Sequence, residues 1–139
     1  PLWSRGLGDV YKRQMKDLSN QAFIFIGNDK LDAEHAKIIN MLADMENSQM
    51  TQQKRIAMCG ELLTYVKTHF VEEEAFMRSY NFPGSDSHSI SHKNLRQNFI
   101  SKLTKFLQND SSVAKDLKRS FYTHVLLHDI SMITYIKNR

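Results

Sequence analysis

The chain has 139 residues, of which 41% are hydrophobic and 24% charged, a balance typical of a single globular domain. Five glycines and two prolines are too few for a β-rich fold with many tight turns, so the composition favours an all-helical protein. No apolar run is long enough for a membrane span or a signal peptide, which predicts a cytoplasmic protein without a membrane partner. The single cysteine, Cys59, is expected to be a small buried helix residue.

The net charge of +4 does not indicate a nucleic-acid-binding protein. Half of this charge comes from residues 1–14, which hold three basic residues against one acidic residue. In the other 125 residues, basic and acidic side chains are interspersed, as they are on a solvated helix face. No basic stripe with interleaved aromatic residues is present, so we expect no nucleic-acid partner.

Residues 1–14 (PLWSRGLGDVYKRQ) have neither a helical nor a strand period, and they end just before Met15. They resemble translated adaptor sequence, and the alternative is a genuine flexible tail. We therefore predict a non-native or disordered leader at 1–14 and one domain at 15–139. The apolar segment 21–27 (QAFIFIG) is predicted to be an N-terminal arm laid over a hydrophobic surface.

The spacing of apolar residues predicts two amphipathic helices in the first half of the domain. The first begins at Asn28 or Asp29, either of which can cap it, and ends at the polar segment 47–51. The second covers about 52–80. It stops at the turn cluster Asn81-Phe82-Pro83-Gly84, the strongest turn signal in the chain.

Two further helices are predicted in the second half. One begins near Ser87 and ends at the polar segment 108–110, and the other is capped by Ser111 or Ser112 and runs toward the end of the chain. Four helices joined by short loops pack as an antiparallel up-down-up-down bundle. The predicted fold is therefore an all-α four-helix bundle with an N-terminal arm.

Several polar residues lie on the sides of these helices that are otherwise apolar and expected to face the core: His35, His69, Glu73, His88, His92 and His124. Burying so many ionisable groups without partners would cost several kcal/mol, against a total stability of about 5–15 kcal/mol. At a helical rise of 1.5 Å per residue, their heights along the bundle agree to roughly 6–10 Å. The sequence therefore predicts one layer of polar residues that satisfy one another or a shared ligand.

The spacing within this set is typical of a metal site. His88 and His92 are four residues apart, and two imidazoles one helical turn apart can chelate one ion. A single buried histidine is usually a satisfied core residue, and a His–Glu pair such as His69 and Glu73 is usually an ordinary helix contact. Histidines or carboxylates recur on the inward-facing sides of three helices, and His124 lies on that of the fourth. A metal site explains this recurrence better than coincidence.

Spacing leaves open which residue of the fourth helix joins the site. His128 follows His124 by four residues and shares its face, whereas Asp129 lies about 140° away on an α-helix. A carboxylate can bridge two metals and a neutral imidazole cannot, so the chemistry favours Asp129. Periodicity and chemistry therefore disagree at this point.

The order of the motifs resembles hemerythrins, specifically the single-domain bacterial kind. The matching segments are LDAEHAKII around His35, THFVEEEAFM at His69 and Glu73, HSISHKNL at His88 and His92, and HVLLHD at His124 and Asp129. The resemblance implies two non-haem irons bridged by Glu73 and Asp129, with His88, His92 and His124 on one iron and His35 and His69 on the other. It makes His128 a neighbouring or surface residue, and Glu72 and Glu74 are expected to be solvated helix charges.

The resemblance also implies reversible O2 binding. The irons would share an oxo or hydroxo bridge, and the iron held by His35 and His69 would keep an open position for O2. Ile38, Phe70 and Phe121 are expected to wall this position with apolar groups. The family often has Trp-Leu where this chain has Ser120-Phe121. The implied protein is an oxygen carrier, store or sensor rather than an enzyme, with an oxygen-consuming enzyme as a candidate partner.

Three other classes fit the sequence less well. A di-iron oxidoreductase or peroxidase of the ferritin-like kind would need Glu-x-x-His motifs on two helices and more carboxylates. An iron-handling protein that repairs iron–sulfur clusters would bring further acidic ligands and a cysteine-bearing region. A sensory module is possible if the chain is a fragment, but no signalling domain fits in 139 residues. Reversible O2 binding is therefore the favoured hypothesis.

Overall fold

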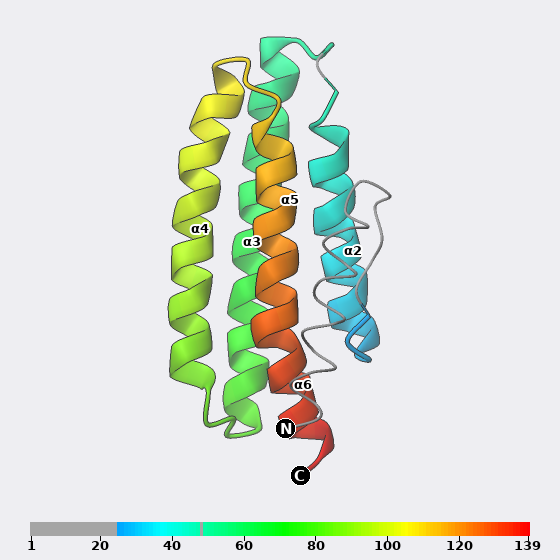
Figure 1. Cartoon of the computed structure of the whole chain (residues 1–139), viewed down its shortest axis with the longest axis vertical. Helices are drawn as coiled ribbons and strands as arrows, with labels where there is room; N and C mark the ends of the chain where they lie inside the picture. Colours follow the sequence, from blue (N-terminus) through cyan, green and yellow to red (C-terminus); the bar gives the residue numbers. More distant parts are fainter. Residues whose placement is uncertain (1–24, 48) are drawn as a thin grey trace.

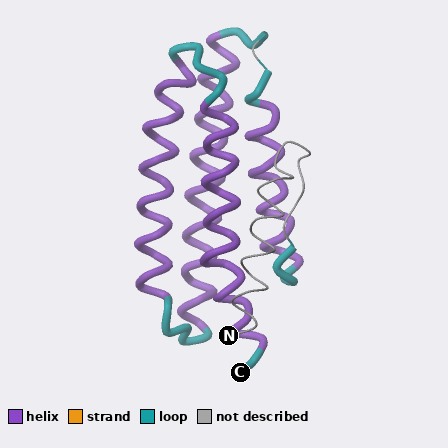
Figure 2. The backbone as a smooth tube through the Cα atoms, in the orientation of Figure 1, coloured by secondary structure: helices purple, strands orange, loops and turns teal. Residues whose placement is uncertain are grey.

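The computed structural model describes residues 25–47 and 49–139, and within them the chain is helical and contains no strand (Figures 1 and 2). Three long helices are followed by a last rod that is built from three continuous pieces. The helices are α2 (Asp29–Asp44), α3 (Gln52–Ser79) and α4 (Ser85–Leu107), and the rod consists of α5 (Val113–His124), a π-helical turn (Val125–Asp129) and α6 (Ile130–Lys137). The predicted all-helical class is confirmed for this part of the chain.

The four rods pack as an antiparallel bundle. Each rod contacts the next along the chain, and α5 also contacts α2, so the ring is closed. Figure 1 shows the direction of the chain alternating from α2 to α3, α4 and α5, with short connections at both ends. The predicted up-down-up-down topology is confirmed. None of the described helices is long and apolar enough to span a membrane.

The start of α2 is fixed by side chains that bind backbone amides. Asn28 is the N-cap, and its Oδ1 accepts a hydrogen bond from the Leu31 amide at 3.0 Å. Gly27 has a φ of 89°, a conformation that strains other residues. Asp32 accepts from the amides of Ile26 at 2.8 Å and Gly27 at 3.2 Å, which ties the entering chain to the first turn. Of the two predicted caps, Asn28 is the one observed.

The ends of α3 and α4 are set by asparagines with positive φ. Asn81 has a φ of 53°, its amide donates to the Arg78 carbonyl and the next amide, of Phe82, donates to Met77. This pair of bonds is a Schellman motif, in which a left-handed residue satisfies the last carbonyls of a helix. Asn109, with a φ of 69°, ends α4 in the same way. Both turns lie where the sequence predicted them.

The predicted boundaries differ from the observed ones by a few residues. Helix α4 begins at Ser85 rather than near Ser87, because the His88 amide already donates to the carbonyl of the N-cap Gly84 at 2.9 Å. The predicted leader at 1–14 and residues 15–24 lie outside the described residues. Of the predicted arm, Phe25 is 75% exposed and Ile26 is buried.

The core runs along the axis of the bundle. Its largest fully buried side chains come from all four rods and include Leu42, Leu62, Phe70, Phe99, Phe106 and Phe121. Burial of such apolar surface stabilises a fold by about 25 cal/mol per Å². Cys59 is buried among these residues, as predicted. The same interior also holds a set of ionisable side chains.

Candidate metal centre

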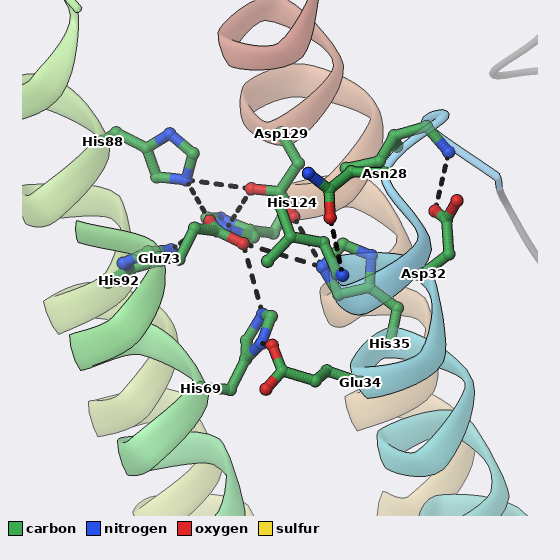
Figure 3. A network of polar contacts seen from close by, with 12 residues as sticks. Asn28, Asp32, Glu34, His35, His69, Glu73, His88, His92, His124 and Asp129 are labelled. Carbon is green, nitrogen blue, oxygen red and sulfur yellow. Dashed lines mark hydrogen bonds and ion pairs between the residues drawn. The ribbon is translucent and has the colours of Figure 1, made fainter. Parts of the chain in front are cut away.

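Seven ionisable side chains from all four rods meet in one buried cluster (Figure 3). None is more than 4% exposed. They are the seven residues that the sequence singled out: His35, His69, Glu73, His88, His92, His124 and Asp129. Because buried charges without partners are costly, the contacts within this cluster decide what it can bind.

Glu73 lies between two groups of imidazoles. Its Oε1 lies 2.9 Å from His88 Nε2 and 3.1 Å from His92 Nε2. Its Oε2 lies 3.3 Å from His69 Nε2 and 3.7 Å from His35 Nε2. The two oxygens of one carboxylate are therefore divided between two sets of nitrogens.

Asp129 divides its oxygens in the same way. Its Oδ1 lies 2.9 Å from His88 Nε2 and 3.2 Å from His124 Nε2, and its Oδ2 lies 3.2 Å from His35 Nε2. Two groups of potential ligand atoms result, each with all its atoms within 4.8 Å of one another. The first comprises Glu73, His88, His92, His124 and Asp129, and the second His35, His69 and Glu73. The cluster is thus arranged around two centres that share carboxylates.

The π-helical turn explains how Asp129 reaches the cluster. On a regular α-helix Asp129 would point about 140° away from His124, but the turn from Val125 to Asp129 is wider and returns the fifth residue to the same face. Asp129 is fully buried, whereas His128 is half-buried and belongs to neither group. The alternative that placed His128 in the site assumed regular α-helical spacing, and the structure brings Asp129 rather than His128 into the cluster.

Outer partners orient three of the five imidazoles. In each of them Nδ1 points away from the cluster and lies within hydrogen-bond distance of an oxygen, which leaves Nε2 facing inward. Where the oxygen belongs to a carboxylate, as in Glu34 and Glu74, Nδ1–H is the donor. The pairs are His69 with Glu34 at 3.0 Å, His92 with Glu74 at 3.0 Å, and His124 with Ser91 at 2.9 Å. The sequence did not identify Glu34 or Ser91, although each directly precedes a histidine of the cluster.

Glu72 and Glu74 differ, although both were expected to be solvated. Glu72 is exposed and pairs with Lys30 at 3.2 Å, as expected for a surface charge. Glu74 is half-buried against α4, where it accepts hydrogen bonds from Ser89 at 2.6 Å and from His92. The expectation for Glu74 is wrong because its position on α3 faces the neighbouring helix rather than solvent.

The cluster favours positive charge beside its two carboxylates. Burial opposes protonation of His35 and His88, but the adjacent carboxylates of Asp129 and Glu73 outweigh it and raise the pKa of each imidazole to about 9. Burial likewise opposes ionisation of Glu73 and Asp129, yet the surrounding imidazoles hold both carboxyl pKa values below their usual range. Two ionised carboxylates therefore persist in the interior, and cations can balance them.

Unsatisfied polar atoms in the cluster fit a metal centre. Among the described residues, several buried inward-facing atoms have no hydrogen-bond partner, including Nε2 of four imidazoles, Glu73 Oε2 and both oxygens of Asp129. Buried polar groups are normally satisfied, so a set of orphaned nitrogen and oxygen atoms facing one another indicates a ligand. Imidazole nitrogens and carboxylate oxygens are common ligands of first-row transition metals.

Apolar residues surround the cluster. Ile38, Phe70 and Phe121 are fully or almost fully buried. The ring of Phe121 lies edge-on to His35 with centroids 5.5 Å apart, and Phe70 stacks on His92 at 4.0 Å. Phe70 also lies 5.7 Å from His69, so it borders both groups of imidazoles. These aromatic contacts restrict the access of water to the cluster.

Fold and site together define a four-helix-bundle protein with a buried histidine–carboxylate metal site. The hemerythrin HHE cation binding domain matches residues 26–133, and the chain therefore belongs to the hemerythrin family. This family comprises non-haem iron proteins that bind O2.

Individual relatives are distant. The chain is 27% identical over 107 residues to the bacteriohemerythrin of Aquifex aeolicus, a match that covers 74% of this chain and 82% of the relative. It is 31% identical over 90 residues to a hemerythrin subunit of Sipunculus nudus, covering 65% of each. A bacteriohemerythrin of Campylobacter jejuni is 29% identical over 79 residues, and the match spans 55% of this chain and 59% of that relative. No solved structure matches the chain.

Proposed function

We propose that the protein holds two iron ions and binds O2 reversibly at them. The observation that carries this proposal is the division of the carboxylate oxygens, because Glu73 and Asp129 each present one oxygen to either group of imidazoles. A carboxylate with both oxygens engaged in this way suits two ions side by side better than one. Membership of the hemerythrin family supports iron as the metal.

Each residue of the cluster has a role in this proposal. Glu73 and Asp129 would serve both irons, His88, His92 and His124 would hold one of them, and His35 and His69 would hold the other. The outer carboxylates Glu34 and Glu74 fix the imidazoles that they contact and increase their basicity. When bound, a pair of ferrous ions supplies the two electrons that reversible O2 binding requires.

The unequal number of imidazoles provides the place for O2. The group with His88 has three imidazoles and the group with His35 has two. If both ions are six-coordinate, the ion beside His35 and His69 has room for one more ligand. The edge of Phe121 lies beside His35, so an apolar diatomic molecule would meet an apolar wall there.

The surroundings favour carriage over turnover. Phe70, Phe121 and Ile38 are buried and present no proton donor. A general acid or a water chain would promote the irreversible reduction of O2, and exclusion of both keeps the ligand releasable. We therefore infer an oxygen carrier, store or sensor rather than an oxidase or peroxidase.

An anaerobic–aerobic cycle tests this function. The iron-loaded, reduced protein is examined by visible spectroscopy under argon, then in air, and again after O2 is removed. We expect a charge-transfer absorption that appears in air, fades when O2 is withdrawn and returns over several cycles. Continuous consumption of O2 with a reductant would instead establish the di-iron oxidoreductase alternative, and a spectrum unaffected by air would refute O2 binding.

A further inference from the structure

A small cavity lies between α2 and α5, beside the imidazole of His35. Its volume is about 10 Å³, close to the least that holds one water molecule. Most of its lining is apolar. Three side chains with polar groups also line it: Asp32, His35 and Tyr122.

His35 presents its outer nitrogen on the side away from the cluster. Its Nε2 faces Asp129 at 3.2 Å, so Nδ1 lies on the opposite edge of the ring. Nδ1 is buried and has no hydrogen-bond partner among residues 25–47 and 49–139. Three other imidazoles of the cluster do have a partner at this nitrogen. The ring of His35 therefore lacks the hydrogen bond at Nδ1 that orients the other three rings.

Tyr122 has a similar unmet group on the other side of the cavity. Its side chain is 2% exposed, and its hydroxyl is buried without a hydrogen-bond partner within the described part of the chain. A phenolic hydroxyl carries its proton at neutral pH, so this group can donate a hydrogen bond. A tyrosine hydroxyl in a protein interior normally has a partner.

The Asp32 carboxylate can accept a further hydrogen bond in the cavity. Its two oxygens already accept from the amides of Ile26 and Gly27, which fixes the carboxylate at the start of α2. A carboxylate has about four acceptor positions, so two remain. The cavity thus offers two donors and one acceptor.

We propose that one buried water molecule occupies this cavity and joins His35, Tyr122 and Asp32. The water oxygen accepts from His35 Nδ1–H and from the Tyr122 hydroxyl, and one of its hydrogens is donated to the Asp32 carboxylate. Three hydrogen bonds are typical of a buried water. Tyr122 is then a positioning residue that acts on His35 through the water.

The consequence for the metal centre rests on the proposed function. In that function His35 belongs to the ion with room for O2, and a hydrogen bond at Nδ1 fixes the ring and makes Nε2 a stronger donor. His35 would thereby gain through a water the support that His69 receives directly from Glu34. The water site itself depends only on the packing of α2 against α5.

The test compares the full chain with Tyr122→Phe, which removes the hydroxyl and keeps the ring. Tyr65→Phe is the matched control, because Tyr65 lies on α3 and contacts Lys37, away from the cavity. Crystal structures of all three proteins locate ordered water. Proton NMR of the iron-loaded proteins measures solvent exchange of the imidazole N–H resonances, which iron shifts away from the rest of the spectrum.

We expect a water within about 2.7–3.2 Å of both Tyr122 Oη and His35 Nδ1, and its loss in Tyr122→Phe. One imidazole N–H should exchange roughly two- to tenfold faster in Tyr122→Phe, the change expected for one hydrogen bond, and none should change in Tyr65→Phe. An empty cavity, or exchange unaltered by Tyr122→Phe, would overturn the proposal. Failure to bind iron would refute the proposed function, while the crystal structures would still decide the water site.

Discussion

Three consecutive glutamates of α3 have three different environments. Glu72 is exposed, Glu73 is fully buried in the cluster, and Glu74 is half-buried between α3 and α4. Burial and hydrogen-bond partners, rather than the residue type, determine what each carboxylate does. The sequence alone could not separate Glu72 from Glu74, because the difference depends on which side chains α4 presents to them.

A matched pair of substitutions tests the role of Glu74. Glu74→Gln keeps the shape but weakens the acceptor of His92 Nδ1–H, and we expect metal affinity to fall by roughly 10- to 100-fold. Glu72→Gln alters an exposed carboxylate that pairs with Lys30 and accepts no hydrogen bond from an imidazole of the cluster, so it should change the affinity much less. Metal titration with a competing chelator measures both. Equal effects would show that the outer hydrogen bond has no influence on the metal.

A second pair tests the residue that the last rod contributes. Asp129→Ala removes a carboxylate that faces both groups of imidazoles, so we expect the metal content to fall from about two ions per chain to one or fewer. His128→Ala removes a half-buried ring outside both groups and should retain about two. Metal analysis of the purified variants decides between them, and the opposite ranking would mean that His128 is the ligand.

Metal binding should release protons. The pKa values of His35 and His88 are raised to about 9 in the metal-free cluster, so at about pH 7.5 both imidazoles carry a proton. A coordinating imidazole is neutral, and filling the site should therefore release about two protons per chain from these residues. Metal affinity should accordingly rise as the pH rises toward 9. Calorimetry in buffers of different protonation enthalpy measures the release, and its absence would show that the imidazoles are neutral before metal binds.

At the scale of elements, the decisive feature is the π-helical turn in the last rod. A π-helical turn contains one residue more than an α-helical one, and here the extra residue lies between His124 and Asp129. Removing it should convert the turn to α-helix and leave both residues on the inner face, now four positions apart.

Deletion of Leu127 tests this explanation. Leu127 is 52% exposed, so its loss removes little core packing. We expect the deletion variant to keep its helical content and about two metal ions. Deletion of Arg119, which is exposed within the regular part of α5, is the control. It should rotate the preceding residues by about 100° relative to His124 and disrupt the packing. Equal loss of metal in both variants would contradict the role assigned to the wide turn.

The sequence predicted the regular helices accurately but did not predict the π-helical turn. Apolar spacing predicted α2, α3 and α4 to within about two residues, because these helices are regular and end at polar or asparagine-containing turns. It could not predict the π-helical turn, since the segment VLLHD gives no local signal for an extra residue. Chemistry and the family resemblance placed Asp129 in the site where periodicity favoured His128.

At the scale of the whole molecule, the cluster joins all four rods. Each rod contributes at least one of its residues, so bound metal would link the rods across the core. The outer partners Glu34 and Ser91 depend on contacts between rods, with His69 and His124 respectively, which is why stripe periodicity did not reveal them. The sequence therefore predicted the residues that meet in the buried cluster better than the outer partners that orient their imidazoles.

We infer that this cluster holds two irons, and the number of irons per chain tests this inference. The full chain is loaded anaerobically with ferrous iron, freed of excess metal and analysed for iron and protein. Because Glu73 and Asp129 divide their oxygens between two groups of imidazoles, we expect close to two irons per chain. A reproducible value of one iron per chain would contradict this expectation, and so would zinc in place of iron in protein purified after growth in iron-replete medium.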